Sequence, residues 1–360
     1  MVGVHWDISW HRSIGRDTFW TPAHIAIYLC GVLAGLSSAY MILSATFSPA
    51  ARALREQSVR IWGFHGPLGA FIMAWGGIAM LTSAPFDDWW HSAYGLDVRI
   101  ISPPHTLLAM GIFHIQLGAI MLILGRLNLA EPGSSAHRTL RWLYLYMGGL
   151  TVVNMATFIM EYTFCVNMHS GVFYLAVGLA IPFYLFAVAG SAGNDRWATT
   201  KVAAVYMLFW QTMNLILPLF PAEPKLGPVY YRVTHFVPSW FPFLLVIPGL
   251  AVDLWLQRAS QLRAWLAGGV AGLIFMAAFL AAQWPFANFL LSPAARNWFF
   301  YAEAFDYRTG EKNYSRLHQF FPWEKTSAEF WTNLALAFAA AMVTTALGHS
   351  LSRWLARVKR

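Results

Sequence analysis

Charged residues and cysteines are both scarce in this chain. Only 11% of its 360 residues are Asp, Glu, Lys or Arg, whereas 58% are hydrophobic. So few charges cannot cover the surface of a water-soluble protein of this length, and the composition is typical of a polytopic membrane protein. The only two cysteines, Cys30 and Cys165, exclude a disulfide framework and a cysteine metal site.

Three kinds of segment are also missing from the sequence. There is no low-complexity stretch and no long polar linker, so we expect no separately folding soluble domain. The N-terminus carries His and Asp where a cleavable signal has a basic region followed by an apolar core. We therefore expect no cleaved leader.

Long apolar runs dominate what is present. Nine of them approach the roughly 17–25 residues that a bilayer-spanning helix requires. They lie at 22–46, 62–84, 103–125, 141–164, 170–191, 199–220, 237–256, 264–283 and 329–351. The pattern predicts an all-α polytopic membrane helix bundle of about nine transmembrane helices.

The basic residues predict the orientation of this bundle. The loops and tail assigned to one side hold 14 Lys and Arg against four acidic residues, whereas the other side holds ten basic and twelve acidic residues. Since positive charge collects in cytoplasmic loops, we expect the C-terminus in the cytoplasm and the N-terminus outside a cell (inner) membrane. The net charge of +8 follows from these loops, and no nucleic-acid partner is expected.

A polar array precedes the first apolar run. Asp7 and His11 are four residues apart, so on a helical turn they share one face. Thr21-Pro22 is typical of a helix start and places His24 in the first turn of the membrane helix. The result is an Asp-x3-His-x12-His array at the outer end of a hydrophobic helix.

The array then occurs a second time. Asp87, His91 and His105 repeat it as Asp-x3-His-x13-His, and His105 follows Ser102-Pro103-Pro104. The two copies also align at Trp10/Trp90, Gly15/Gly95 and Asp17/Asp97. The predicted orientation puts both copies on the outer, periplasmic side, where they are possible neighbours forming either one site or two.

Two imidazoles and a carboxylate form the ligand set of many open metal sites, which keep positions for water, oxygen or substrate. Ionisable groups at membrane depth are costly and usually functional. We therefore predict metal ligands at Asp7, His11, His24, Asp87, His91 and His105. Surrounding or interface roles are assigned to Asp17, Asp97 and Asp88, and His5 is a possible extra ligand. The plainer alternative is that the Asp residues cap helices and pair with Arg12, Arg16 or Arg99, beside ordinary interface histidines.

The chain divides at about residue 130. Residues 1–130 contain the duplicated array and helices 1–3, and residues 131–360 add six more membrane helices. Within the second part, 284–328 is rich in aromatic residues and mixed in charge, which predicts an outer interfacial cap with one or two short amphipathic helices. Glu161 and His169, at outer helix ends, are read as helix-end hydrogen-bonding groups or as members of a proton path.

The first array and its flanks resemble a known metal-binding segment. Asp7-Ile-Ser-Trp-His11, with Arg16-Asp17-Thr18-Phe19-Trp20-Thr21-Pro22-Ala23-His24, is similar to the copper-binding segment of the C subunit of particulate methane monooxygenase and ammonia monooxygenase. The second array resembles that family's second membrane metal site, Asn-x3-His-x13-His, with Asp87 in place of Asn. The resemblance covers about residues 5–125.

This resemblance implies one or two copper ions held by the two arrays. It also implies oxygen activation to hydroxylate a small substrate such as methane, ammonia or a short hydrocarbon, with two further subunits in a trimeric complex. Asp87 makes the second array a two-His-one-carboxylate set, which also suits iron(II), and zinc is a further possibility.

Two other functions remain open at this stage. One is a membrane protein that captures or passes copper or zinc without oxygenase activity, which requires a polar path across the bilayer. The other is a haem or quinol electron-transfer protein, which requires histidines facing one another at mid-membrane. Most histidines here lie at predicted helix ends instead.

Overall fold

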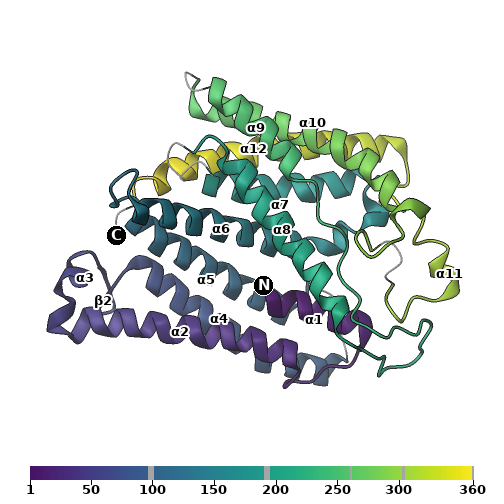
Figure 1. Cartoon of the computed structure of the whole chain (residues 1–360), viewed down its shortest axis with the longest axis horizontal. Coiled ribbons are helices and arrows are strands. Elements are labelled where there is room, and N and C mark those ends of the chain that lie inside the picture. Colours follow the sequence, from purple (N-terminus) through teal and green to yellow (C-terminus); the bar gives the residue numbers. More distant parts are fainter. Residues whose placement is uncertain (96–100, 190–194, 260–261, 302–304, 359–360) are drawn as a thin grey trace.

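The computed structural model describes residues 1–95, 101–189, 195–259, 262–301 and 305–358. The described chain is mostly helical (Figure 1). Its α-helices are α1 (Val2–Ser13), α2 (Pro22–Phe47), α3 (Arg52–Glu56), α4 (Leu68–Tyr94), α5 (Pro103–Leu127), α6 (Ser135–Phe158), α7 (Gly171–Ala189), α8 (Ala198–Ile216), α9 (Val246–Arg258), α10 (Ala264–Leu290), α11 (Glu311–Tyr314) and α12 (Ser327–Leu355). Short 3-10 turns are η1 (Pro49–Ala51), η2 (Met160–Tyr162), η3 (Cys165–Asn167), η4 (Leu217–Leu219) and η5 (Pro293–Ala295). Strands β1 (Val59–Ile61) and β2 (Phe64–Gly66) pair as an antiparallel hairpin, with Arg60 opposite His65.

The prediction of a helical membrane protein agrees with six helices in the described residues that are long and apolar enough to cross a bilayer. They are α2, α4, α5, α10, α12 and α8 with its continuation to Leu219. The predicted segments 141–164 and 170–191 correspond to α6 and α7. Sequence and structure therefore agree on an all-α bundle.

Two predicted segments differ from the observed helices. The segment 237–256 is helical only from Val246, because Pro238 and Pro242 disfavour helix in the residues before them. At 13 residues, α9 is about 20 Å long and shorter than the roughly 30 Å hydrocarbon core. By contrast, α4 continues past Pro85 to Tyr94, about ten residues beyond the predicted apolar segment 62–84. This extension carries Asp87 and His91 on the helix itself.

Helices α2, α4 and α5 lie side by side with alternating direction (Figure 1). The start of α2, the end of α4 and the start of α5 therefore meet at one end of the bundle, where α1 packs beside them. This arrangement brings the two polar arrays to the same end of the molecule. The largest buried apolar cluster of the described residues lies in the rest of the bundle, mainly between α6, α7, α8, α10 and α12.

Helix α1 is anchored through its small residues. A Cβ on Gly3 would lie 2.8 Å from Ile27, so α1 packs directly on α2. The Ser9 hydroxyl donates a 2.7 Å hydrogen bond to the Val237 carbonyl, and the Val237 N–H donates to Ser13 Oγ at 2.7 Å. One face of α1 is thereby bound to the non-helical chain before α9. Asp7 and His11 lie on a different face of α1.

Glycines allow α4 and α5 to approach closely. A Cβ on Gly76 would lie 2.7 Å from the Gly111 carbonyl oxygen and 2.7 Å from the Ile115 nitrogen. Gly69 and Gly118 face each other's backbone in the same way. Small residues that let backbones meet are a common basis of helix packing in membranes. These contacts hold the first half of α4 closely against α5.

We expect Gly76→Ala to destabilise the protein by about 1–3 kcal/mol, because the added methyl group overpacks the backbone of α5. Gly35→Ala is the matched control, since a Cβ at Gly35 meets nothing within 4 Å. Thermal unfolding of both variants in lipid measures the difference. Equal melting temperatures for the two variants would contradict the close α4–α5 contact.

The predicted orientation is testable with a single introduced cysteine. Gly310→Cys, in a chain whose exposed Cys30 is replaced by Ser, should react with a membrane-impermeant maleimide from outside intact cells. Glu131→Cys, on the opposite predicted side, should react only after the membrane is permeabilised. The reverse pattern would invert the orientation of the bundle.

Candidate metal centres

The first ligand group joins α1 to the start of α2. Asp7 and His11 occupy successive turns of α1, and His24 lies in the first turn of α2. Asp7 Oδ1 is 3.1 Å from His24 Nε2, and Asp7 Oδ2 is 3.8 Å from His11 Nε2. One ligand atom from each residue lies within 4.8 Å of the other two. The structure thus brings the first predicted triad together.

Asp17 belongs to the same group. Its Oδ2 atom is 3.5 Å from Nε2 of His11 and 3.5 Å from Nε2 of His24. Its side chain is only 5% exposed, less than that of either histidine. The sequence suggested a surrounding role for Asp17, but the structure places it in direct contact with both imidazoles. It is a fourth candidate ligand.

The loop between α1 and α2 orients His24. The Thr18 N–H donates a 2.8 Å hydrogen bond to Thr21 Oγ1, and His24 Nδ1 donates to the Thr18 carbonyl at 3.0 Å. Thr21 is the N-cap of α2 and Pro22 follows it, as predicted, although the Thr21 hydroxyl binds the loop rather than the helix. Because Nδ1 donates to this carbonyl, the ring is held with Nε2 directed at Asp7 and Asp17.

The second ligand group joins the end of α4 to the start of α5. Asp87 Oδ2 is 3.5 Å from His91 Nε2, and Asp87 Oδ1 is 3.4 Å from His105 Nε2. The three side chains are 14–26% exposed, and their ligand atoms again lie within 4.8 Å of one another. His91 Nδ1 donates to the Gly95 carbonyl at 3.2 Å, so its Nε2 also faces the carboxylate. The second predicted triad is therefore assembled as well.

The aligned glycines explain why the same spacing recurs. Gly15 and Gly95 have φ angles of +83° and +87°, a left-handed conformation that favours glycine. Each follows the helix that carries the Asp-x3-His pair, and its N–H donates to that helix's last turn, at Trp10 and His91 respectively. In the first copy the chain then enters α2, which carries His24, and in the second copy His105 lies at the start of α5. In both copies the ligands thus come from the end of one helix and the start of the next.

The distances within each group fit a bound metal ion. With metal–ligand distances of about 2.1 Å, neighbouring ligand atoms are about 3.0 Å apart in an octahedron and about 3.4 Å apart in a tetrahedron. The carboxylate–imidazole distances here are 3.1–3.8 Å in the first group and 3.4–3.5 Å in the second. Nitrogen and oxygen ligands of this kind suit copper, iron or zinc.

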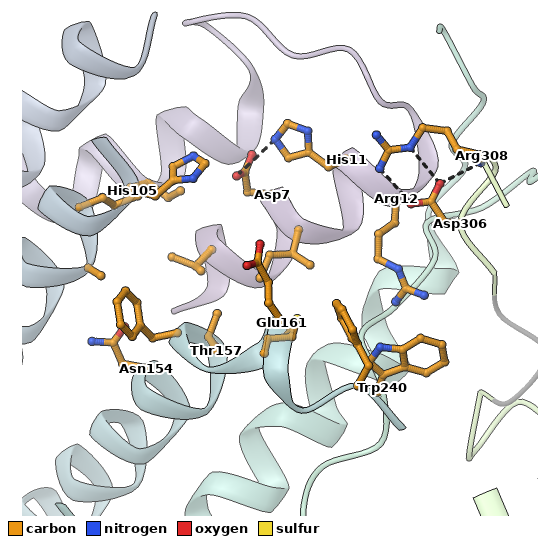
Figure 2. Close-up of a pocket in the computed structure, with 18 of the residues that line it drawn as sticks. Asp7, His11, Arg12, His105, Asn154, Thr157, Glu161, Trp240, Asp306 and Arg308 are labelled. Carbon is orange, nitrogen blue, oxygen red and sulfur yellow. Dashed lines mark hydrogen bonds and ion pairs between the residues drawn. The ribbon is translucent and has the colours of Figure 1, made fainter. Parts of the chain in front are cut away.

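The two groups are separate but adjacent. A cavity of about 400 Å³ is lined by Asp7 and His11 of the first group and by His105 of the second. Figure 2 shows these three side chains along one wall of the cavity, with Glu161 pointing toward Asp7 from the opposite wall. The arrays therefore form two ligand groups that share one cavity.

The pKa of Asp7 reflects this crowded environment. Burial by itself raises the pKa, but the contact with His24 and the positive charges of His11, His24 and His105 lower it below its ordinary value. Asp7 is therefore a carboxylate at neutral pH, as a metal ligand must be.

Neither His5 nor Asp88 belongs to the two ligand groups. His5 is fully buried, 4.6 Å from the Trp210 ring, and burial together with the N-terminal amino group lowers its pKa to about 3. It belongs to neither group. Asp88 is exposed, and Asp97 lies outside the described residues. Arg12 bonds to the Pro238 carbonyl and covers the Trp240 ring, whereas the ion-pair contacts of Asp7 are with His11 and His24.

Several residues of the cavity wall are distant in sequence from the arrays. Glu161, predicted as a helix-end group or a member of a proton path, lines the cavity, whereas His169, which the same prediction covers, is stacked between Trp284 and Phe320. Asp306 and Arg308 form a two-bond ion pair at the far end of the cavity, beside Arg12 (Figure 2). No spacing pattern links these residues, so only the fold reveals them.

Comparison with protein-family models, with curated proteins and with solved structures found no match.

We expect His11→Ala and His24→Ala each to remove about one bound metal ion per chain, because each deletes a ligand of the first group. His137→Ala, on a helix start far from both groups in sequence, is the control. Asp17→Asn should weaken metal affinity roughly 10- to 100-fold, the usual effect of disturbing a close partner of the ligands. Metal content by mass spectrometry of the purified protein in lipid measures these effects. Unchanged metal content in both His variants would show that the first group binds no metal.

Proposed function

We propose that this chain is a copper-dependent membrane monooxygenase subunit, or a homologue of one, that hydroxylates a small substrate. The observation that supports it best is the presence of two His/Asp groups bordering one cavity. A metal that only stabilises a fold has no need of an adjoining space, whereas oxygen chemistry requires room for substrate beside the ligands. The resemblance of the first array to the copper segment of the monooxygenase C subunit points the same way.

In this proposal Asp7, His11 and His24 hold the first ion, with Asp17 beside it, and Asp87, His91 and His105 hold the second. Bound copper supplies the redox chemistry for O2. The chain itself fixes the ligands through the carbonyls of Thr18 and Gly95, and surrounds them with apolar helices that limit access of water.

Hydroxylation of a C–H bond by O2 consumes two electrons and two protons and releases one water. The electrons come from an external donor. Glu161 is placed to carry protons, because its carboxyl group points into the cavity toward Asp7 (Figure 2). This role extends the proton-path reading of Glu161 to a specific place in the molecule.

The proposal includes the membrane arrangement expected from the sequence. The segments predicted from hydropathy, about nine in number, cross the cell (inner) membrane, although helix α9 covers only part of the segment 237–256. The metal groups lie at the periplasmic face and the C-terminus in the cytoplasm. Large exposed apolar residues on α2, such as Leu33, Leu36 and Tyr40, face lipid or the two further subunits of a trimeric complex.

The two competing functions receive less support. A haem or quinol protein requires histidines facing one another at mid-membrane, but His114 bonds to the Met110 carbonyl of its own helix. A metal-handling protein requires polar residues leading away from the ligands across the bilayer. The cavity does contain Glu161, Asn154 and Thr157, so copper or zinc transfer without oxygenase activity is the second candidate.

Metal content and oxidation assays separate these functions. We expect the purified chain in lipid to hold one or two copper ions, which the His11→Ala/His91→Ala double variant loses. The copper-loaded chain, supplied with a reductant and its partner subunits, should oxidise a small hydrocarbon or ammonia with consumption of O2. Bound copper or zinc that exchanges readily without O2 consumption would favour metal handling instead. Iron in place of copper would retain oxygen chemistry but contradict the family analogy.

A further inference from the structure

The cavity beside the two metal groups is much larger than a gas molecule. Its volume is about 400 Å³. A protein cavity of about 150 Å³ is enough to bind benzene, with six non-hydrogen atoms. By the same ratio, this cavity holds an apolar molecule of roughly 10–16 non-hydrogen atoms. Methane and ammonia have one such atom each.

The cavity wall offers mainly apolar surface. Thirteen of its 23 lining residues are aliphatic, aromatic or Met. They come from several elements: Val4 and Ile8 from α1, Ile27 from α2, Leu108 and Ile112 from α5, and Phe158 from α6. Asp7 and His105 line the same cavity as these apolar residues. A hydrocarbon chain bound in this cavity would therefore lie near the ligands with little loss of apolar contact.

The charges in the wall do not favour an anionic molecule. Three carboxylates line the cavity, on Asp7, Glu161 and Asp306, against two guanidinium groups, on Arg12 and Arg308. Arg308 is bound to Asp306 by two hydrogen bonds of 3.0 and 3.2 Å, and Arg12 contacts the Pro238 carbonyl and the Trp240 ring. These side chains supply no surplus positive charge for a fatty acid or phosphate head group.

We infer that this cavity binds an uncharged hydrocarbon of intermediate size, such as a medium-chain alkane or a small polycyclic compound, rather than methane or ammonia. The inference rests on the proposed function, because it identifies the hydrocarbon as the substrate of the adjoining metal groups. Binding itself requires only the apolar wall, so it can be measured with and without metal.

A photoreactive decane, carrying a diazirine at one end, tests the inference directly. In the purified full chain in lipid, it should label residues of the cavity wall, identified by peptide mass spectrometry. Unlabelled decane should reduce this labelling at least tenfold. Neither methane nor decanoate at the same concentration should reduce it.

Two pairs of variants separate cavity binding from contact with lipid. Ala109→Phe fills the cavity from α5, whereas Met110→Phe adds the same ring at a residue that is 53% exposed. Val4→Phe fills it from α1, and Val2→Phe, also at a position 53% exposed, is its control. We expect at least a tenfold loss of labelling in Ala109→Phe and Val4→Phe, and none in the controls. Copper content should be retained in all four variants.

The outcomes distinguish this inference from the proposed function. Labelling that is equal in the filling variants and the controls, or that decanoate suppresses as well as decane does, would overturn the hydrocarbon site. Specific labelling in a chain that binds no metal would support the site but remove the monooxygenase proposal. Full copper content with labelling confined to lipid-facing residues would support the metal groups but overturn the hydrocarbon site.

Discussion

The contact between Asp7 and His24 is the interaction on which the rest of the site depends. It joins a short helix to the first membrane helix, with 3.1 Å between Asp7 Oδ1 and His24 Nε2. Both side chains are mostly withdrawn from solvent, so their desolvation costs several kcal/mol unless an opposite charge compensates it. Asp17 brings a second carboxylate to the same place. Burying two carboxylates and two imidazoles in an apolar bundle costs free energy of folding. Such groups are usually functional, so we infer that this one is as well.

The parts of this site that are local in sequence could be predicted from it. Asp7 and His11 share a helix face because they are four residues apart, and Thr21-Pro22 identifies the start of the helix that carries His24. The repeat of these features around Asp87 and His105 predicted the second group. Gly15 and Gly95 aligned for a reason that only the backbone shows, since both adopt positive φ at the end of a helix.

The parts that depend on tertiary packing could not be predicted. Hydropathy ends at about residue 84, yet α4 stays helical to Tyr94 and carries Asp87 on its last turns. The apolar run 237–256 contains a short helix preceded by non-helical chain, because prolines interrupt it and Ser9 and Ser13 bind its Val237 backbone. The direct contact of Asp17 with both histidines requires the loop to close over them. The cavity combines α1, α5, α6 and the segment around Asp306, and no periodicity in the sequence connects these elements.

A proton and a metal ion are two cations that can hold such a group together, and our proposal of a metal rests on the following distances. If the imidazoles are protonated, each Nε2–H can make one strong hydrogen bond, and the 3.1 Å contact of His24 with Asp7 suits that. The other carboxylate contacts of Nε2, at 3.4–3.8 Å, are mostly too long for charge-assisted hydrogen bonds, which are about 2.7–2.9 Å. They are close to the separations between neighbouring ligands of one ion. In addition, His24 and His91 donate from Nδ1 to backbone carbonyls, which directs their Nε2 atoms at carboxylate oxygens in both groups. One divalent cation in each group would bind these nitrogen and oxygen atoms together, whereas a proton joins only one pair of them at a time.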